Sequence, residues 1–175
     1  MFRMDRDWLR RSLTAQIILA AYFQAFEWFP LGSLNDQTGT HNRPLVEQLK
    51  VGTATVGDVA FAIAFILPAA LFLIGYIKKI RLLLWICLIS YLAWFVLQVQ
   101  GWWIAYICGA SENWQRVYHR VFGKTLKLLP SWGNHLAPDA MHLVIQLLLL
   151  AVIVPGALGL MKRSSVDDNH PFANE

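Results

Sequence analysis

The chain has 175 residues, of which 57% are hydrophobic and 15% are charged, and its formal net charge is +4 at pH 7. A soluble globular domain usually carries about 25% charged residues, so this composition argues against a soluble protein and indicates a membrane protein. The positive charge does not indicate nucleic-acid binding, because the basic residues lie in short blocks between apolar stretches, as membrane topology requires. The length accommodates one domain, and a single transmembrane domain is expected over residues 1–175.

Four apolar stretches of roughly 20 residues predict an all-α fold, an integral membrane four-helix bundle. A pair of arginines precedes the first stretch, as in a targeting signal. Gln16, Gln24 and Glu27 interrupt that stretch, however, and no A-x-A cleavage site follows it, which favours a retained helix. The four predicted spans are residues 13–31, 55–77, 82–108 and 138–161.

The Lys and Arg residues outside the spans predict the orientation of the chain. Nine of them lie close to the membrane, in the N-terminal segment, in the short turn between the second and third spans and after the fourth span, whereas six are spread over two long loops. Both termini are therefore expected on the cytoplasmic side of a bacterial-type plasma membrane, with residues 162–175 as a disordered tail. The expected partners are membrane lipids, and a homo-oligomer or a larger membrane complex is a further prediction.

The loop between the third and fourth spans predicts an amphipathic helix that Ser111 caps and that runs to about Leu129. Its apolar residues recur at helical spacing, and its basic residues lie mostly on the opposite side. Two interpretations stay open. The helix lies on the outer membrane surface and faces lipid headgroups, or it covers the bundle as a lid. The basic residues assigned to the lipid-facing side are Arg116, Arg120, Lys124 and Lys127.

Polar residues of all four spans are predicted to gather near the outer ends of the helices. Asp139, His142 and Gln146 share one face of the fourth span, at positions i, i+3 and i+7. Because an ionisable group inside a membrane faces the protein interior, Glu27 is expected to meet His142, Gln98 or water there. The complete predicted layer is Glu27, Asp58, Gln98, Gln100, Asp139 and His142.

This layer has three interpretations. It is a pocket for a small molecule or a lipid headgroup, a metal site, or a purely structural set of interhelical contacts. The metal interpretation depends on two ligands from one helix turn, and its candidates are Asp139, His142 and Glu27. The aromatic lining of the pocket would be Trp28, Trp102 and Trp103.

The leading functional hypothesis is a binding or accessory membrane protein with an outward-facing polar pocket. A small membrane enzyme that acts on a lipid or another envelope substrate, metal-dependent in one version, is the alternative. A structural or assembly role is the third. The sequence contains no Gly-rich phosphate loop and no G-x-S-x-G, H-E-x-x-H or C-x-x-C motif, so it assigns no catalytic residue and no cofactor.

Overall fold

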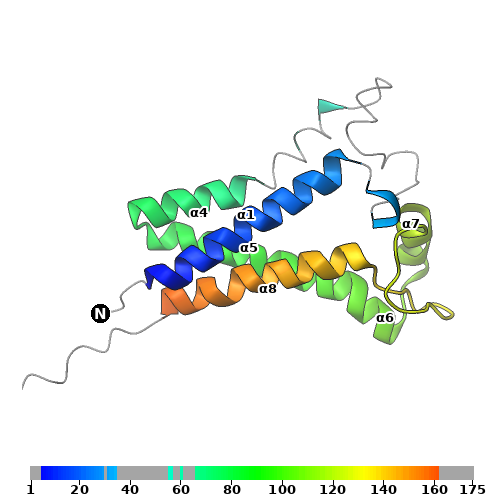
Figure 1. Cartoon of the computed structure of the whole chain (residues 1–175). Coiled ribbons are helices and arrows are strands. Elements are labelled where there is room, and N and C mark those ends of the chain that lie inside the picture. The colour runs from blue at the N-terminus through cyan, green and yellow to red at the C-terminus, as the bar shows by residue number, and fades with distance from the viewer. Residues whose placement is uncertain (1–4, 30, 35–54, 57–59, 61–65, 162–175) are drawn as a thin grey trace, which may run out of the picture.

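The computed structural model describes residues 5–29, 31–34, 55–56, 60 and 66–161. Within these ranges the chain is all-α, as predicted, with helices and two isolated β-bridges but no strand. Asp58 and the predicted tail lie outside the described residues. The helices that lie side by side in Figure 1 are α1 (Arg6–Trp28), α4 (Leu67–Lys78), α5 (Arg81–Val99) and α8 (Ala140–Met161).

Shorter elements extend and cover this group of helices. The π-helix η2 (Gln100–Ile104) and the helix α6 (Ala105–Cys108) continue α5 without a break. A 3-10 helix, η1 (Gly32–Leu34), follows α1. The helix α7 (Glu112–Phe122) belongs to the connection between α6 and α8, which lies at the end of the helices where α8 begins (Figure 1). Residues 110–139 of this connection are called the cap below.

Two helical segments are long and apolar enough to cross a membrane, by length and composition. They are the continuous segment Arg81–Cys108 and the helix α8. Helix α4 is apolar but has only 12 residues, and α1 carries several charged residues in its first turns. Two of the four predicted spans therefore have the expected character in the described part of the chain, and the complete four-span arrangement stays a prediction.

The helix boundaries follow from local sequence. The Asp5 side chain caps α1 by accepting hydrogen bonds from the backbone N–H groups of Asp7 and Trp8. Helix α1 ends at Trp28 because Phe29 precedes a proline and adopts an extended conformation, with φ −119° and ψ 144°. Helix α4 ends at Lys78, and the next residue, Lys79, adopts the left-handed conformation with φ 58° and returns the chain sharply into α5.

The helix predicted from Ser111 to Leu129 is shorter than expected. Ser111 caps it as predicted, by accepting a hydrogen bond from Trp114 N, but it ends at Phe122 before Gly123. Beyond it, backbone groups pair with other segments instead of continuing a helix: Leu126 N donates to Ser33 O at 2.7 Å and Leu128 N to Pro138 O at 3.0 Å. Lys124 and Lys127 therefore lie outside the helix, and their assignment to a lipid-facing helical side is wrong.

Helices α1 and α8 approach each other closely because two glycines of α8 face α1. A Cβ atom at Gly156 would lie 2.5 Å from Leu88 Cδ2 and 2.9 Å from Ser12 Oγ. A Cβ atom at Gly159 would lie 2.8 Å from Leu9 Cγ. Across the same contact, Ser12 Oγ donates to Val152 O at 2.8 Å, in the helix that Pro155 interrupts. Small residues thus set the spacing of these two helices.

Substitution Gly156→Ala is expected to destabilise the protein by about 1–3 kcal/mol, because the added methyl group overpacks the contact with Leu88 and Ser12. The matched control is Gly101→Ala, where the nearest atom would be Trp114 Cζ2 at 3.8 Å. Thermal unfolding of both variants in detergent measures the difference. A Gly156→Ala variant that is as stable as Gly101→Ala would contradict this account of the packing.

Candidate functional site

The carboxylate of Asp139 is completely buried between the cap and the first turn of α8. Its Oδ1 accepts a hydrogen bond from His142 N at 2.9 Å, so the side chain caps α8. The same oxygen lies 2.7 Å from His142 Nδ1. Its other oxygen, Oδ2, lies 2.9 Å from Thr125 Oγ1. Both oxygens of a buried acid therefore have polar partners, as a buried charge requires.

Asp139 is ionised at neutral pH despite its burial. Burial by itself raises the pKa of this carboxyl, but the hydrogen bonds from the side chain and backbone of His142 and from the Thr125 hydroxyl hold the pKa below its ordinary value. An ionised carboxylate only accepts hydrogen bonds, so the proton between the two side chains belongs to His142 Nδ1. In the neutral imidazole, Nε2 then carries the free lone pair.

His142 is held in one orientation. Its side chain is 9% exposed, and its Nδ1 is fixed by Asp139. The Trp102 ring stacks on the imidazole with ring centroids 3.9 Å apart and an interplanar angle of 29°. Phe122 contacts it edge-on, at 5.2 Å and 88°. Among the residues that the structure describes, no group forms a hydrogen bond with Nε2. One ring nitrogen is thus oriented and the other left available.

The π-helix η2 brings two of the three tryptophans of the predicted lining, Trp102 and Trp103, to this site. A π-helical turn inserts an extra residue and changes which side chains face a neighbouring helix. Trp102 thereby stacks on His142, while Trp103 Nε1 donates to Gln146 Oε1 at 2.6 Å. Trp114 of α7 donates to the Gly101 carbonyl within the π-turn, at 2.9 Å. The cap and the long helix are therefore joined at the place where the helix is irregular.

Lys127 supplies a positive charge close to the buried acid. Its Nζ donates to Thr125 Oγ1 at 2.8 Å and also to the Phe122 carbonyl, and it lies 4.4 Å from the centre of the Tyr118 ring. Burial lowers the pKa of the Lys127 ammonium, and the negative charge of Asp139 opposes that effect. Thr125 Oγ1 accepts from this ammonium and donates toward Asp139, so it connects the two charges.

Gln146 lies one turn deeper than His142 on the same face of α8 and is 5% exposed. Its Oε1 accepts from Trp103, but its Nε2 is buried without a hydrogen-bond partner in the described structure. Buried amide donors are nearly always satisfied, so this Nε2 requires a partner that the described residues do not supply. The site thus presents an acceptor at His142 Nε2 and a donor at Gln146 Nε2.

The predicted polar layer is only partly brought together. Asp139 and His142 form its centre. Glu27 is half-buried on α1 and does not form the expected contact with His142, whose partner is Asp139. Gln98 is half-buried, and its Oε1 has no hydrogen-bond partner in the described structure. Gln100 is exposed and therefore lies outside the interior.

The remaining predicted residues lie at the periphery. Trp28 donates to Gln24 within α1, at 2.9 Å, and does not contact His142. Arg116 and Arg120 are exposed on α7, as expected for its basic side, and Lys124 is exposed in the turn that follows the helix. Within the described ranges, no three His, Cys, Asp or Glu side chains gather as metal ligands, so Glu27 does not complete a site with Asp139 and His142.

Three contributors were not predicted from the sequence. Phe122 and Thr125 were not assigned to the site, and Lys127 was assigned only to the basic side of the predicted loop helix. Their roles depend on the turn after Phe122, where Thr125 N donates to Phe122 O at 3.2 Å. Gly123 directly after Phe122 was the one sequence signal for this turn, because glycine disfavours a continuing helix.

Comparison with protein-family models, with curated protein sequences and with solved structures finds no match to this chain. The function is therefore argued from the geometry of the site alone.

Substitution Asp139→Asn is expected to destabilise the fold by about 3 kcal/mol at neutral pH. It removes a buried negative charge to which His142 and Thr125 both donate hydrogen bonds. The pKa of Asp139 is lower in the folded chain, so its ionisation stabilises the fold above its unfolded pKa. That contribution is lost as the pH falls through the lower native pKa. Thermal unfolding between pH 7 and pH 3 should show a flatter acid dependence for this variant than for the wild type.

The exposed carboxylate of Glu112 provides the matched control, as Glu112→Gln. This control should keep both the neutral stability and the acid dependence of the wild type. Equal acid dependence in the wild type and in Asp139→Asn would show that the buried carboxylate is not the stabilising ion.

Proposed function

We propose that the protein is a multi-pass membrane protein that binds a hydroxyl-bearing, anionic lipid headgroup at its cap end. The membrane position is supported by the exposed apolar side chains of the long helix, such as Leu82, Ile89 and Leu97. The orientation is supported by the basic residues at the opposite end, where the Arg81 side chain donates to the Leu160 carbonyl at 2.7 Å. That end is cytoplasmic, and the cap faces outward.

The single observation that carries this proposal is the pair of unused polar atoms on α8. His142 Nε2 is an acceptor whose orientation Asp139 fixes, and Gln146 Nε2 is a buried donor without a partner. A hydroxyl group is the simplest ligand group that satisfies both, because it donates one hydrogen bond and accepts others. An isolated carboxylate or phosphate could not donate to Nε2, and it would meet the negative charge of Asp139.

The charge of the headgroup follows from the cap. Arg116, Arg120 and Lys124 are exposed around the site, and Lys127 is half-buried beside it. Exposed basic residues at a membrane surface attract anionic phospholipids. A phospholipid with a glycerol headgroup offers a phosphate to these residues and hydroxyls to His142 and Gln146. Phosphatidylglycerol is therefore the appropriate probe.

The enzyme alternative is favoured by one specific feature. A carboxylate that orients an imidazole with a free Nε2 is the arrangement of a general base. In that case His142 would take the proton of the hydroxyl that it binds. Mass spectrometry of phosphatidylglycerol incubated with the protein separates the two functions. Binding leaves the mass of the lipid unchanged, whereas catalysis converts it into a product of different mass.

Replacing His142 with Gln is expected to lower the retention of phosphatidylglycerol at least fivefold, because the Nε2 acceptor is lost. The measurement is native mass spectrometry of protein released from detergent micelles that contain phosphatidylglycerol and phosphatidylcholine in equal amounts. Phosphatidylcholine lacks the headgroup hydroxyl and should be retained equally by the wild type and the variant.

His119→Gln is the matched control, because His119 is an exposed histidine of the cap. It should bind as the wild type does. A second variant, Gln146→Leu, removes the unpartnered donor without touching the Asp139–His142 pair, and it should also lose selectivity. It removes the acceptor of the Trp103 indole as well, so a somewhat lower melting temperature is expected. Equal retention of both lipids by the wild type, or an unchanged preference in His142→Gln, would overturn the proposal.

A further inference from the structure

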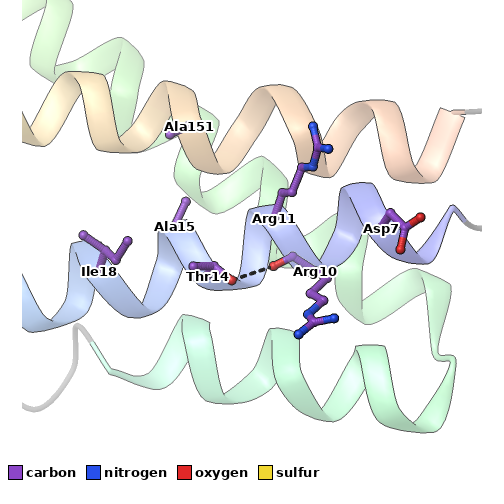
Figure 2. A pocket seen from close by; sticks show the side chains of 7 residues that line it. All are labelled: Asp7, Arg10, Arg11, Thr14, Ala15, Ile18 and Ala151. Atoms are coloured by element: carbon purple, nitrogen blue, oxygen red, sulfur yellow. Dashed lines mark hydrogen bonds between the residues drawn. The ribbon is translucent and has the colours of Figure 1, made fainter.

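A second site lies at the other end of the molecule, along α1. An open groove of about 600 Å³ runs beside this helix and is bounded on one side by Ala151 of α8 (Figure 2). Its inner part is apolar, with Ala15, Ile18 and Ala151, and its outer part carries two arginines. The small side chains of Ala15 and Ala151 leave this space open between neighbouring helices. The full lining is Asp7, Arg10, Arg11, Thr14, Ala15, Ile18 and Ala151.

The charges of the groove follow a fixed order from the end of the helix inward. Asp7 comes first, Arg10 and Arg11 follow one turn later, and Thr14 follows them. Between described residues, no ion pair joins either arginine to Asp7 or to another carboxylate. Arg11 is positioned by the Trp8 ring, at 4.7 Å from its centre. The groove therefore presents one negative and two positive groups that are open to a ligand.

The arginines bracket the groove. In Figure 2, Arg11 extends across the ribbon of α8, whereas Arg10 extends toward α4. Two guanidinium groups on either side of a groove suit a phosphate between them, because arginine presents several donors to phosphate oxygens. The Thr14 hydroxyl donates to the Arg10 carbonyl at 3.0 Å and keeps its acceptor lone pairs for a ligand.

We propose that this groove binds a phospholipid that carries a primary amine on its headgroup. The amine meets Asp7, the phosphate lies between Arg10 and Arg11, and an acyl chain follows Ile18 and Ala151. From Asp7 to Ile18 the helix rises about 16 Å, so the polar and apolar parts of one lipid fit along it in the same order. The turn between Asp7 and the arginines rises about 5 Å, which a two-carbon ethanolamine linker spans.

The position of Asp7 decides between lipid classes. An anionic phospholipid without an amine would place its headgroup against an unpaired carboxylate. A choline headgroup carries the positive charge but has no N–H donor for the carboxylate. An ethanolamine headgroup supplies both the charge and the donors. This inference rests on the proposed orientation, in which the start of α1 lies at the cytoplasmic headgroup level.

The test is native mass spectrometry of the full-length protein in detergent micelles that contain phosphatidylethanolamine, phosphatidylglycerol and phosphatidylcholine in equal amounts. Wild-type protein should retain phosphatidylethanolamine at least threefold more than phosphatidylcholine. Asp7→Asn should abolish that preference, and Arg10→Gln combined with Arg11→Gln should lower the retention of phosphatidylethanolamine at least fivefold. The soluble headgroup glycerophosphoethanolamine should not be retained, because it lacks the acyl chains that the inner groove receives.

Two controls separate the groove from general effects. Lys78→Gln removes one exposed positive charge at the same end without touching the groove, and it should leave retention unchanged. Ala151→Trp fills the groove and should lower retention without any change of charge, whereas Leu150→Trp places the same side chain at an exposed position outside the groove and should not. Circular dichroism should show equal helix content in all of these variants.

Failure of this proposal and failure of the cap-end proposal give different results. The His142→Gln variant should retain phosphatidylethanolamine as the wild type does. The Asp7→Asn variant should retain phosphatidylglycerol as the wild type does, and adding His142→Gln to it should lower that retention. Retention of phosphatidylethanolamine that is unchanged by Asp7→Asn and by Ala151→Trp would overturn the groove proposal and leave the cap-end proposal standing.

Discussion

The arrangement of the cap depends on a single buried negative charge. Asp139 is completely buried, and an ion in such a place is tolerated only when each of its oxygens is hydrogen-bonded. Three constraints follow from this requirement. Helix α8 has to begin where its backbone can donate to the carboxylate, His142 has to present Nδ1, and Thr125 has to approach from the cap. The available nitrogen of the imidazole is thus a consequence of satisfying the charge.

The cap and the irregular part of the long helix complete the site together. Trp102 stacks on His142 from a π-helical turn, and the Trp114 indole donates a hydrogen bond to the Gly101 carbonyl of that turn. Tyr118 donates to the Ala137 carbonyl at 2.7 Å, and burial raises the pKa of this phenol, so it stays protonated and keeps the bond. A tightly packed aromatic shell therefore surrounds one oriented histidine, while an amide donor one turn deeper has no partner. These features favour a binding site over a purely structural contact.

The sequence was informative where local rules decide the structure. Its apolar runs predicted the two long apolar helices, Ser111 predicted the start of α7, and the spacing of Asp139, His142 and Gln146 predicted their shared face. It was not informative where tertiary contacts decide. Periodicity extended α7 past Phe122, because the backbone pairing of Leu126 with Ser33 leaves no trace in the pattern. Hydropathy and the expected depth in the membrane placed Glu27 near His142. The actual partner of His142 is Asp139, which lies three residues earlier in the chain.

Buried Asp139 fixes the proton on His142 Nδ1 and thereby leaves Nε2 as an acceptor. Solid-state or solution NMR of protein labelled with ¹⁵N-histidine measures the protonation of each ring nitrogen directly, with His142→Gln used to assign the signal. At neutral pH the account predicts a protonated Nδ1 and an unprotonated Nε2 for His142, and the loss of this single tautomer in Asp139→Asn. A protonated Nε2, with or without a proton on Nδ1, would show that this nitrogen is not an acceptor, and so would a His142 signal that is identical in Asp139→Asn.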